Sequence, residues 1–214
     1  MKLSIIIPAY CFNELTGKQT IDLADKVLSQ IDKEEHELIV VDDGSTYDIS
    51  ELKDRCKYIR LETNQGAATA RNTGIDASSG EFINFLDADD TIPDDAVAIL
   101  ADRIKTEEQL VKPNGIVQFK ARFEDGFVDY PTVSAIGKLI RRDWIGDDRF
   151  DPDQLIGEED TLFHKEGKTC VINYDPRVIY QHRQSANPDS LMKRFWRGDI
   201  PRRKGTNQYA KEFK

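Results

Sequence analysis

Short apolar runs alternate with longer segments of helical periodicity along the first half of the chain. The apolar runs predict strands at 3–8, 37–41, 58–61 and 81–86, and the helical segments predict helices at 15–31, 67–77 and 93–107. Within 15–31, for example, Leu23, Val27 and Ile31 recur at helical spacing. Strand and helix units in this order are typical of an α/β fold with a mainly parallel sheet.

The second half of the chain, from Gly115 onward, is less regular. Its pattern predicts strands at 116–123, 138–141, 170–173 and 178–181, and short helices near 159–166 and 188–195. The sequence contains no internal repeat, low-complexity tract or obvious linker. Because 214 residues with 39% hydrophobic content can bury one core, we expect a single domain over 1–214.

The charge of the chain is acidic overall but basic at its C-terminal end. A net charge of −9 argues against general nucleic-acid binding, since proteins that neutralise phosphates usually carry a basic excess. The segment 191–214 contains the basic residues Lys193, Arg194, Arg197, Arg202, Arg203 and Lys204. They predict contact with an anionic membrane surface or a polyanionic partner. The alternative is a terminal helix that packs Phe195 and Trp196 on the core while its charges are solvated.

Two further features bear on the compartment. No apolar run approaches the eighteen or so residues that span a bilayer, and the first residues lead directly into a predicted strand. We therefore expect a cytoplasmic protein without a transmembrane segment, membrane-peripheral at most through its basic end. Cys11, Cys56 and Cys170 are odd in number and far apart, so we expect reduced cysteines that pack rather than a disulfide framework or a metal site.

Three carboxylates directly follow the predicted strand 81–86. Asp87, Asp89 and Asp90 repel one another unless a cation joins them, and carboxylate oxygens suit Mg²⁺ or Mn²⁺. Ligands of open α/β sheets bind beyond the carboxyl ends of the strands, where this cluster and the polar residues at 8–10 and 42–43 are expected. The alternative is a solvated turn in which Asp90 caps the following helix.

A glycine- and alanine-rich segment at 64–74 is the second candidate. Gly66 and the alanines after it permit close approach of the backbone to a ligand, and Arg71 can pair with a phosphate or a carboxylate. The alternative is an ordinary alanine-rich helix that begins at Gly66.

These motifs together resemble the family-2 glycosyltransferases, which have the GT-A fold. The resemblance rests on four segments that follow one another in the family's order, at 4–10, 39–46, 64–74 and 80–90. It covers about residues 3–100 strongly and continues more weakly at 138–142, 157–160 and 180–183. It implies a Rossmann-like α/β domain that transfers a sugar from a nucleotide diphosphate to an acceptor, with inversion and with Mn²⁺ or Mg²⁺ as cofactor.

The resemblance also implies which residues bind the donor. Tyr10 and Asp43 would hold the nucleotide base, usually uracil, in a pocket lined by Pro8 and Ala9. An aromatic face can stack on a base, and a carboxylate can accept a hydrogen bond from its ring N–H. The other donor-site residues implied are Asp42, Asn64, Gly66, Arg71, Asp87 and Ala88.

The metal site and the catalytic base are implied in the same way. Asp89 would be the main metal ligand, Asp87 would contact the ribose or a metal-bound water, and His182 would complete the site. The base would lie in the acidic run 158–160 of the second half, where Asp160 is the first choice and Glu159 the second. The resemblance thus assigns donor and metal binding to 1–110 and the acceptor and base to 111–190.

Two departures from the family and two rival functions remain. Residues 11–19 differ from the usual short polar turn, and the second half is short. A sugar-phosphate nucleotidyltransferase would carry a glycine-rich basic loop after the first strand, whereas Tyr10 and Asn13 lie in that loop here. A non-catalytic nucleotide-sugar-binding module would keep the donor site without turnover. The acceptor stays open among lipid-linked glycan, wall polymer, protein and nucleic acid, and polysaccharide or cell-envelope assembly is the family's commonest setting.

Overall fold

The computed structural model describes residues 1–109, 115–123, 128–129, 135–153 and 172–182. All of them belong to one compact unit, Met1–Arg183. The helices predicted at 159–166 and 188–195, together with Cys170, lie outside the described residues. A single domain over all 214 residues therefore stays a prediction.

The first half of the chain follows the predicted alternation of strands and helices. Its elements are β1 (Leu3–Ala9), α1 (Glu14–Leu28), β2 (His36–Asp42), the 3-10 turn η1 (Ser50–Leu52), β3 (Lys57–Arg60), α2 (Ala67–Ala77), β4 (Phe82–Phe85) and α3 (Ala96–Glu108). Helix α1 begins after Asn13, whose side chain accepts a hydrogen bond from the backbone N–H of Thr16 in a capping box. Helix α3 begins three residues later than predicted from Pro93, because Asp95 is its N-cap.

The second half differs from the prediction in its last strand, and it contains a short strand at 128–129 and a short helix at 142–145 that the pattern did not predict. Its described elements are β5 (Ile116–Phe123), β6 (Val128–Asp129), β7 (Lys138–Arg141), α4 (Arg142–Ile145) and β8 (Ile172–His182). The two strands predicted at 170–173 and 178–181 are the single strand β8, so that prediction is wrong. In the polar middle of β8, Asp175 pairs with Phe119, and the ladder then skips two residues before Val178 pairs with Lys120. The strand therefore continues past its polar middle through an irregularity of the ladder.

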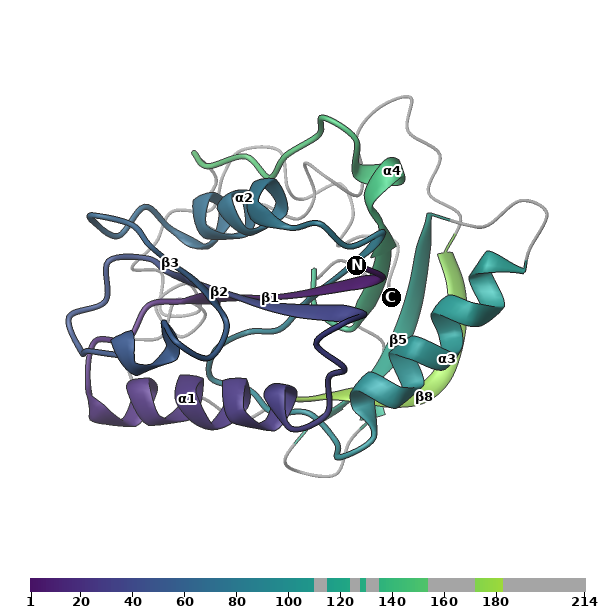
Figure 1. Ribbon diagram of the computed structural model, residues 1–214, viewed down its shortest axis with the longest axis horizontal. Helices are drawn as coiled ribbons and strands as arrows, with labels where there is room; N and C mark the ends of the chain where they lie inside the picture. Colours follow the sequence, from purple (N-terminus) through teal and green to yellow (C-terminus); the bar gives the residue numbers. More distant parts are fainter. Residues whose placement is uncertain (110–114, 124–127, 130–134, 154–171, 183–214) are drawn as a thin grey trace, which may run out of the picture. The chain divides into compact units, whose positions relative to one another are not determined.

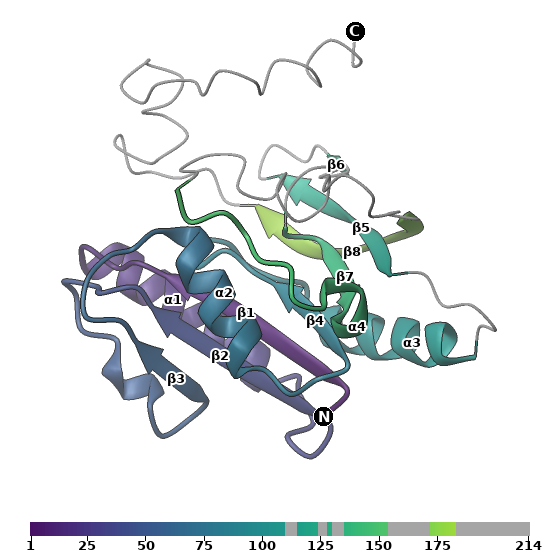
Figure 2. The same ribbon diagram turned by 90° about the horizontal axis from the view of Figure 1, so that it is seen from above.

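The described strands form one sheet in the order β3-β2-β1-β4-β7-β5-β6, with β8 also paired to β5 (Figures 1 and 2). Strands β3, β2, β1 and β4 are parallel to one another. Strand β7 is antiparallel to both β4 and β5, whereas β8 is parallel to β5. The prediction of a parallel sheet is therefore correct for the first half, and the second half is mixed.

Helices cover both faces of the parallel part of the sheet (Figure 1). Leu3, Ile5 and Ile7 of β1 point to the face covered by α1 and α3. Ile6, between them, points to the opposite face and packs with residues of α2. Gly74 of α2 is needed for this packing, because an added Cβ would lie 2.4 Å from Cγ2 of Ile6. The strand is buried on both faces, which explains its uninterrupted apolar run.

The carboxyl ends of β1, β2 and β4 meet at one edge of the sheet. Beyond the ladder itself, the N–H of Asp43 donates to the carbonyl of Ala9 at 2.8 Å, and the N–H of Leu86 donates to the carbonyl of Ile6 at 3.0 Å. The three polar clusters predicted to bind ligand therefore lie at the same edge. In the part of the chain that the structure describes, no helix is both long and apolar enough to cross a membrane. Cys11 and Cys56 are free, as predicted.

Candidate functional site

Asp43 connects the end of β2 to the loop that precedes α2. One carboxylate oxygen accepts the N–H of Gln65 and the other accepts the N–H of Gly66, each at 2.8 Å. The predicted donor residues Asn64 and Gly66 are thereby held beside Asp43. Burial raises the pKa of the Asp43 carboxyl, although both backbone bonds favour its charged form. Each oxygen retains a second lone pair, so the carboxylate can still accept a bond from a ligand.

Asp42, one residue earlier, is bonded entirely differently. Its carboxylate is fully buried and accepts bonds from the N–H of Ser45 at 2.8 Å, from the hydroxyl of Tyr58 and from the guanidinium of Arg60. Burial, with Asp42 beside the hydroxyl, raises the pKa of Tyr58. The described contacts of Asp42 are therefore with its own loop and β3, and they stabilise the turn that presents Asp43.

Asp42→Asn is expected to lower the free energy of unfolding by about 1 to 3 kcal/mol, because a neutral amide cannot replace the charge-assisted bonds to the buried carboxylate. The matched variant Asp43→Asn is expected to lower the affinity for uridine diphosphate more strongly than Asp42→Asn does. Urea unfolding and calorimetric titration measure the two quantities. A fully stable Asp42→Asn protein that has lost nucleotide binding would show that Asp42 contacts the ligand directly.

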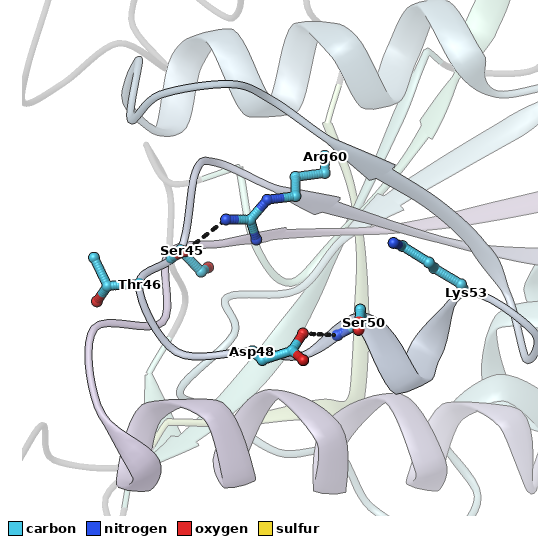
Figure 3. A pocket seen from close by; sticks show the side chains of 6 residues that line it. All are labelled: Ser45, Thr46, Asp48, Ser50, Lys53 and Arg60. Carbon is cyan, nitrogen blue, oxygen red and sulfur yellow. Dashed lines mark hydrogen bonds between the residues drawn. The ribbon is translucent and has the colours of Figure 1, made fainter.

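A polar pocket of about 250 Å³ lies next to the Asp42 turn (Figure 3). It is lined by Ser45, Thr46, Asp48, Ser50, Lys53 and Arg60. The guanidinium of Arg60 donates to the carbonyl of Ser45 at 2.8 Å across one side of it. Neither Tyr10 nor Asp43 is among its lining residues, so this pocket is not the predicted pocket for the nucleotide base.

The segment after β1 presents an exposed aromatic pair. The Tyr10 side chain is exposed, and its ring centroid lies 6.4 Å from that of Phe12, with the planes tilted by 33°. Pro8 is half-buried and Ala9 is buried, so Tyr10 is the member of the predicted base pocket that offers a ring to a ligand. Phe12, which departs from the family's pattern, adds a second ring beside it.

The acidic loop, residues 86–95 between β4 and α3, is held from two sides. On one side, Nη2 of the buried Arg71 donates to Oδ1 of Asp87 at 3.1 Å, which joins α2 to the end of β4. Ala88 packs on the core, and Asp89 is half-buried. Arg71 thus pairs with a carboxylate, one of the two partners considered for it, and its role in binding the donor stays a prediction.

On the other side, β8 brings His182 to the same loop. Thr91 and Gln181 exchange two backbone hydrogen bonds of 3.0 and 2.8 Å, and Nδ1 of His182 lies 3.0 Å from Oδ1 of Asp90. The Asp90 carboxyl is only 1% exposed, and burial raises its pKa to about 7. The hydrogen bond to Asp90 in turn raises the pKa of His182. The alternative that Asp90 caps the helix is wrong, since Asp95 is the N-cap of α3.

The acidic loop and His182 offer carboxylate and imidazole groups of the kinds that bind divalent cations. Among the described ranges, no three side chains of histidine, cysteine, aspartate or glutamate converge as a closed metal site. Asp89 nevertheless lies in the loop to which His182 is bonded, and the Nδ1 bond to Asp90 orients the imidazole as carboxylates do in known metal sites. Asp89 and the Nε2 atom of His182 are the groups that would hold Mn²⁺ or Mg²⁺, with remaining positions left for phosphate oxygens.

Sequence reasoning missed Asp90 as the residue that positions His182. Nothing in the local pattern pairs two residues that are 92 positions apart. The base candidates Glu159 and Asp160 lie outside the described residues, so their roles stay predictions.

The comparisons with known proteins identify the family and the fold. Residues 4–157 match the family model described as Glycosyl transferase family 2. An uncharacterized glycosyltransferase of Rickettsia bellii is 47% identical over 94 residues, which are 42% of this chain and 13% of the relative. The structure of S. aureus TarS 1-349 in complex with UDP aligns with a TM-score of 0.71 and 22% identity, over 86% of this chain and 61% of that chain.

A second solved structure is the mannosyltransferase PcManGT from Pyrobaculum calidifontis in complex with GDP-Man and Mn²⁺. It aligns with a TM-score of 0.62 and 18% identity, over 92% of this chain and 59% of that chain. At such identities the two structures share the fold, and they confirm the predicted GT-A fold. This chain spans about an eighth of the Rickettsia relative and about three-fifths of each solved chain. Because the family match covers most of its residues, the chain belongs to glycosyltransferase family 2.

Proposed function

We propose that this protein is an inverting, divalent-metal-dependent glycosyltransferase that uses a UDP-sugar as donor. The observation that carries the proposal is the meeting of three anchored groups at one edge of a GT-A sheet. They are Asp43 bonded to the loop before α2, Asp87 bonded to Arg71, and His182 bonded to Asp90. Such an edge is where α/β sheets bind their ligands.

The donor would lie across this edge. Tyr10 offers a face for the base, and Asp43 offers a carboxylate for its ring N–H. Asp87 is placed by Arg71 at the end of β4, where it can reach the ribose or a metal-bound water. When bound, Mn²⁺ or Mg²⁺ supplies positive charge that offsets the charge developing on the departing diphosphate.

The chemistry itself needs one base. Asp160, or Glu159 as second choice, would accept the proton of the acceptor hydroxyl as that oxygen bonds to the anomeric carbon of the sugar. The bond from the same carbon to the diphosphate oxygen breaks in the same step, and the electron pair leaves with the nucleotide. A single displacement on the opposite face inverts the anomeric centre.

A binding experiment first tests which nucleobase the donor carries. With Mn²⁺ present, saturating uridine diphosphate is expected to raise the melting temperature by about 5 to 10 °C, and more than the guanosine or adenosine diphosphates do, because Tyr10 and Asp43 favour a pyrimidine. TarS was solved with UDP, whereas PcManGT was solved with GDP-Man, so the fold accommodates both bases. A larger shift with a purine diphosphate would overturn the choice of UDP.

The two rival functions differ from this proposal in the loop after β1 and in turnover. A nucleotidyltransferase is disfavoured because Asn13 caps α1 in place of a glycine-rich loop after β1. A binding module without activity would bind the donor but would not cleave it to nucleotide diphosphate. We place the reaction in the cytoplasm, in polysaccharide or cell-envelope glycan assembly, with a glycan, a lipid-linked or another hydroxyl compound as acceptor. Contact with an anionic surface through 191–214 stays a prediction, since that segment lies outside the described residues.

A further inference from the structure

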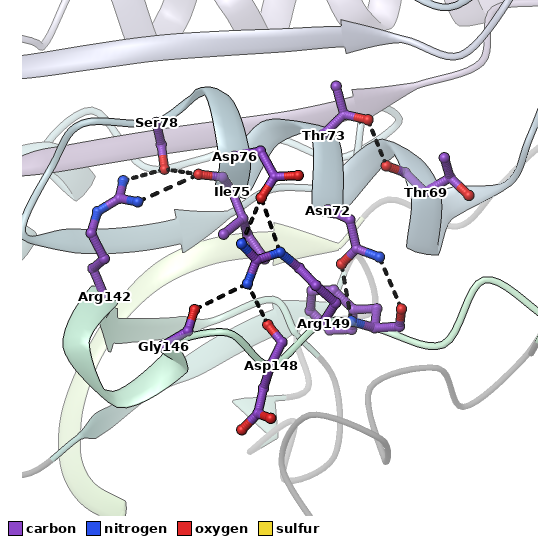
Figure 4. Close-up of polar contacts among 11 residues, drawn as sticks. Thr69, Asn72, Thr73, Ile75, Asp76, Ser78, Arg142, Gly146, Asp148 and Arg149 are labelled. Atoms are coloured by element: carbon purple, nitrogen blue, oxygen red, sulfur yellow. Dashed lines mark hydrogen bonds and ion pairs between the residues drawn. The ribbon is translucent and has the colours of Figure 1, made fainter.

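The segment 146–153, which directly precedes the residues that carry the predicted base, is anchored on α2 (Figure 4). The side-chain amide of Asn72 donates to the carbonyl of Phe150 at 2.9 Å and accepts its N–H at 3.0 Å. Arg149 donates from Nε and Nη2 to one oxygen of Asp76 at 3.0 and 2.6 Å. Two successive residues of the segment are thus bonded to one helix.

The start of this part of the chain is fixed to the C-terminal end of α2 and the residues that follow it. Arg142 of α4 donates to the carbonyl of Gly80 at 2.7 Å. It also donates to the hydroxyl of Ser78 (Figure 4). Residues 142–150 are therefore bonded along α2 from its C-terminal end to its middle. We call residues 146–153 the anchor segment.

The side chain of Phe150 reaches from the anchor segment to the donor site. It is 1% exposed, and its ring packs edge to face on Phe85, the last residue of β4, with 5.6 Å between the ring centroids. The guanidinium carbon of Arg71 lies 5.7 Å from the Phe150 ring centroid, and Arg71 donates to Asp87. Contacts thus run without interruption from the anchor segment to the acidic loop.

A ring at this position has an electrostatic consequence. Arg71 is almost fully buried, and Asp87 and the negative face of the aromatic ring are among the groups that stabilise its charge. An aliphatic side chain of similar volume would fill the space but would not attract the cation. The guanidinium would then hold Asp87 less firmly.

We propose that Phe150 is a positioning residue, through which the anchor segment holds Arg71 against Asp87 and so orders the acidic loop that receives the donor. The proposal deepens the proposed function, because it assigns the ordering of the donor site to the segment that leads to the base. It requires that Phe150 act through Arg71 and without touching donor.

Hydrogen exchange on the free protein tests this. In Phe150→Leu, the amides of residues 86–92 are expected to exchange about three to thirty times faster than in the wild type. The matched control is Phe82→Leu, because Phe82 is also 1% exposed and lies 5.6 Å from the guanidinium of Arg141 at the other end of β4. The control is expected to change the exchange of residues 86–92 by less than about twofold.

A double-mutant cycle separates action through Arg71 from general loss of packing. Arg71→Ala is expected to speed exchange of the loop, and adding Phe150→Leu to it should add nothing further. If Phe150→Leu does not fold, Asn72→Ala gives the same test, because it removes both hydrogen bonds that hold the backbone of Phe150. Additive effects in the cycle, or equal effects of the Phe150 and Phe82 variants, would overturn the inference.

Donor affinity gives the second readout. Phe150→Leu is expected to weaken binding of uridine diphosphate with Mn²⁺ about three- to thirtyfold, and Phe82→Leu to leave it unchanged. If the wild type binds no nucleotide and turns over no nucleotide sugar, the proposed function is wrong. The exchange measurement still decides the role of Phe150 in that case, since it needs no ligand.

Discussion

Asp89→Ala is expected to abolish transfer and to weaken Mn²⁺-dependent binding of uridine diphosphate by at least about a hundredfold, because the diphosphate loses its counter-charge when the main metal ligand is removed. Asp94→Ala is the matched control, since Asp94 lies five residues further along the same loop and its side chain is 95% exposed in a pair with Lys26. Isothermal titration with Mn²⁺ and with chelator measures the difference. An Asp89→Ala protein that binds the nucleotide as the wild type does would remove Asp89 from the metal site.

Asp160→Asn is expected to leave donor binding nearly intact while transfer falls by about two to four orders of magnitude, which is the usual contribution of a positioned general base. Asp153→Asn serves as the control, because Asp153 is an exposed carboxylate at the end of the anchor segment. Initial rates at saturating donor, together with the dissociation constant for the donor, separate the chemical step from binding. If Glu159→Gln produces the loss and Asp160→Asn does not, the base lies one residue earlier.

Local pattern predicted every α-helix and strand of the first half, with bounds that differ from the observed ones by up to three residues. Apolar runs such as Leu3–Ala9 are buried on both faces, and α2 has the predicted bounds 67–77. The strand β8 was predicted as two pieces because its middle, around Asp175 and Arg177, is polar. Asp175 pairs with Phe119 and accepts hydrogen bonds from Arg177, which lies in an irregularity of the ladder, so pairing with β5 continues on both sides of the polar middle.

The candidate site was predicted in its membership but not in its bonding. The motif led to Asp42 and Asp43 together, yet only the structure shows that Asp42 is bonded to Tyr58 and Arg60, whereas Asp43 is bonded to the loop before α2. The contacts of Asp42 with Tyr58 and Arg60 depend on the parallel pairing of β2 with β3, which the sequence does not encode locally.

The contacts of two positioning residues have no local signal in the sequence. Asp90 meets His182 because Thr91 pairs with Gln181, and Phe150 meets Arg71 because Asn72 binds its backbone. Such contacts join residues about 80 to 90 positions apart, so they follow from the completed sheet and helices and not from spacing in the chain.

Release of nucleotide diphosphate by the purified protein tests the central claim most directly. The protein would be incubated with a panel of UDP-, GDP- and ADP-sugars, with Mn²⁺ or with chelator. The nucleotide diphosphate released would be measured for the wild type and, under the same conditions, for Asp89→Ala. We expect release from a UDP-sugar that requires the divalent ion and is lost in the variant. If no donor in the panel releases nucleotide, or if chelation and Asp89→Ala leave the release unchanged, the protein is not a metal-dependent glycosyltransferase.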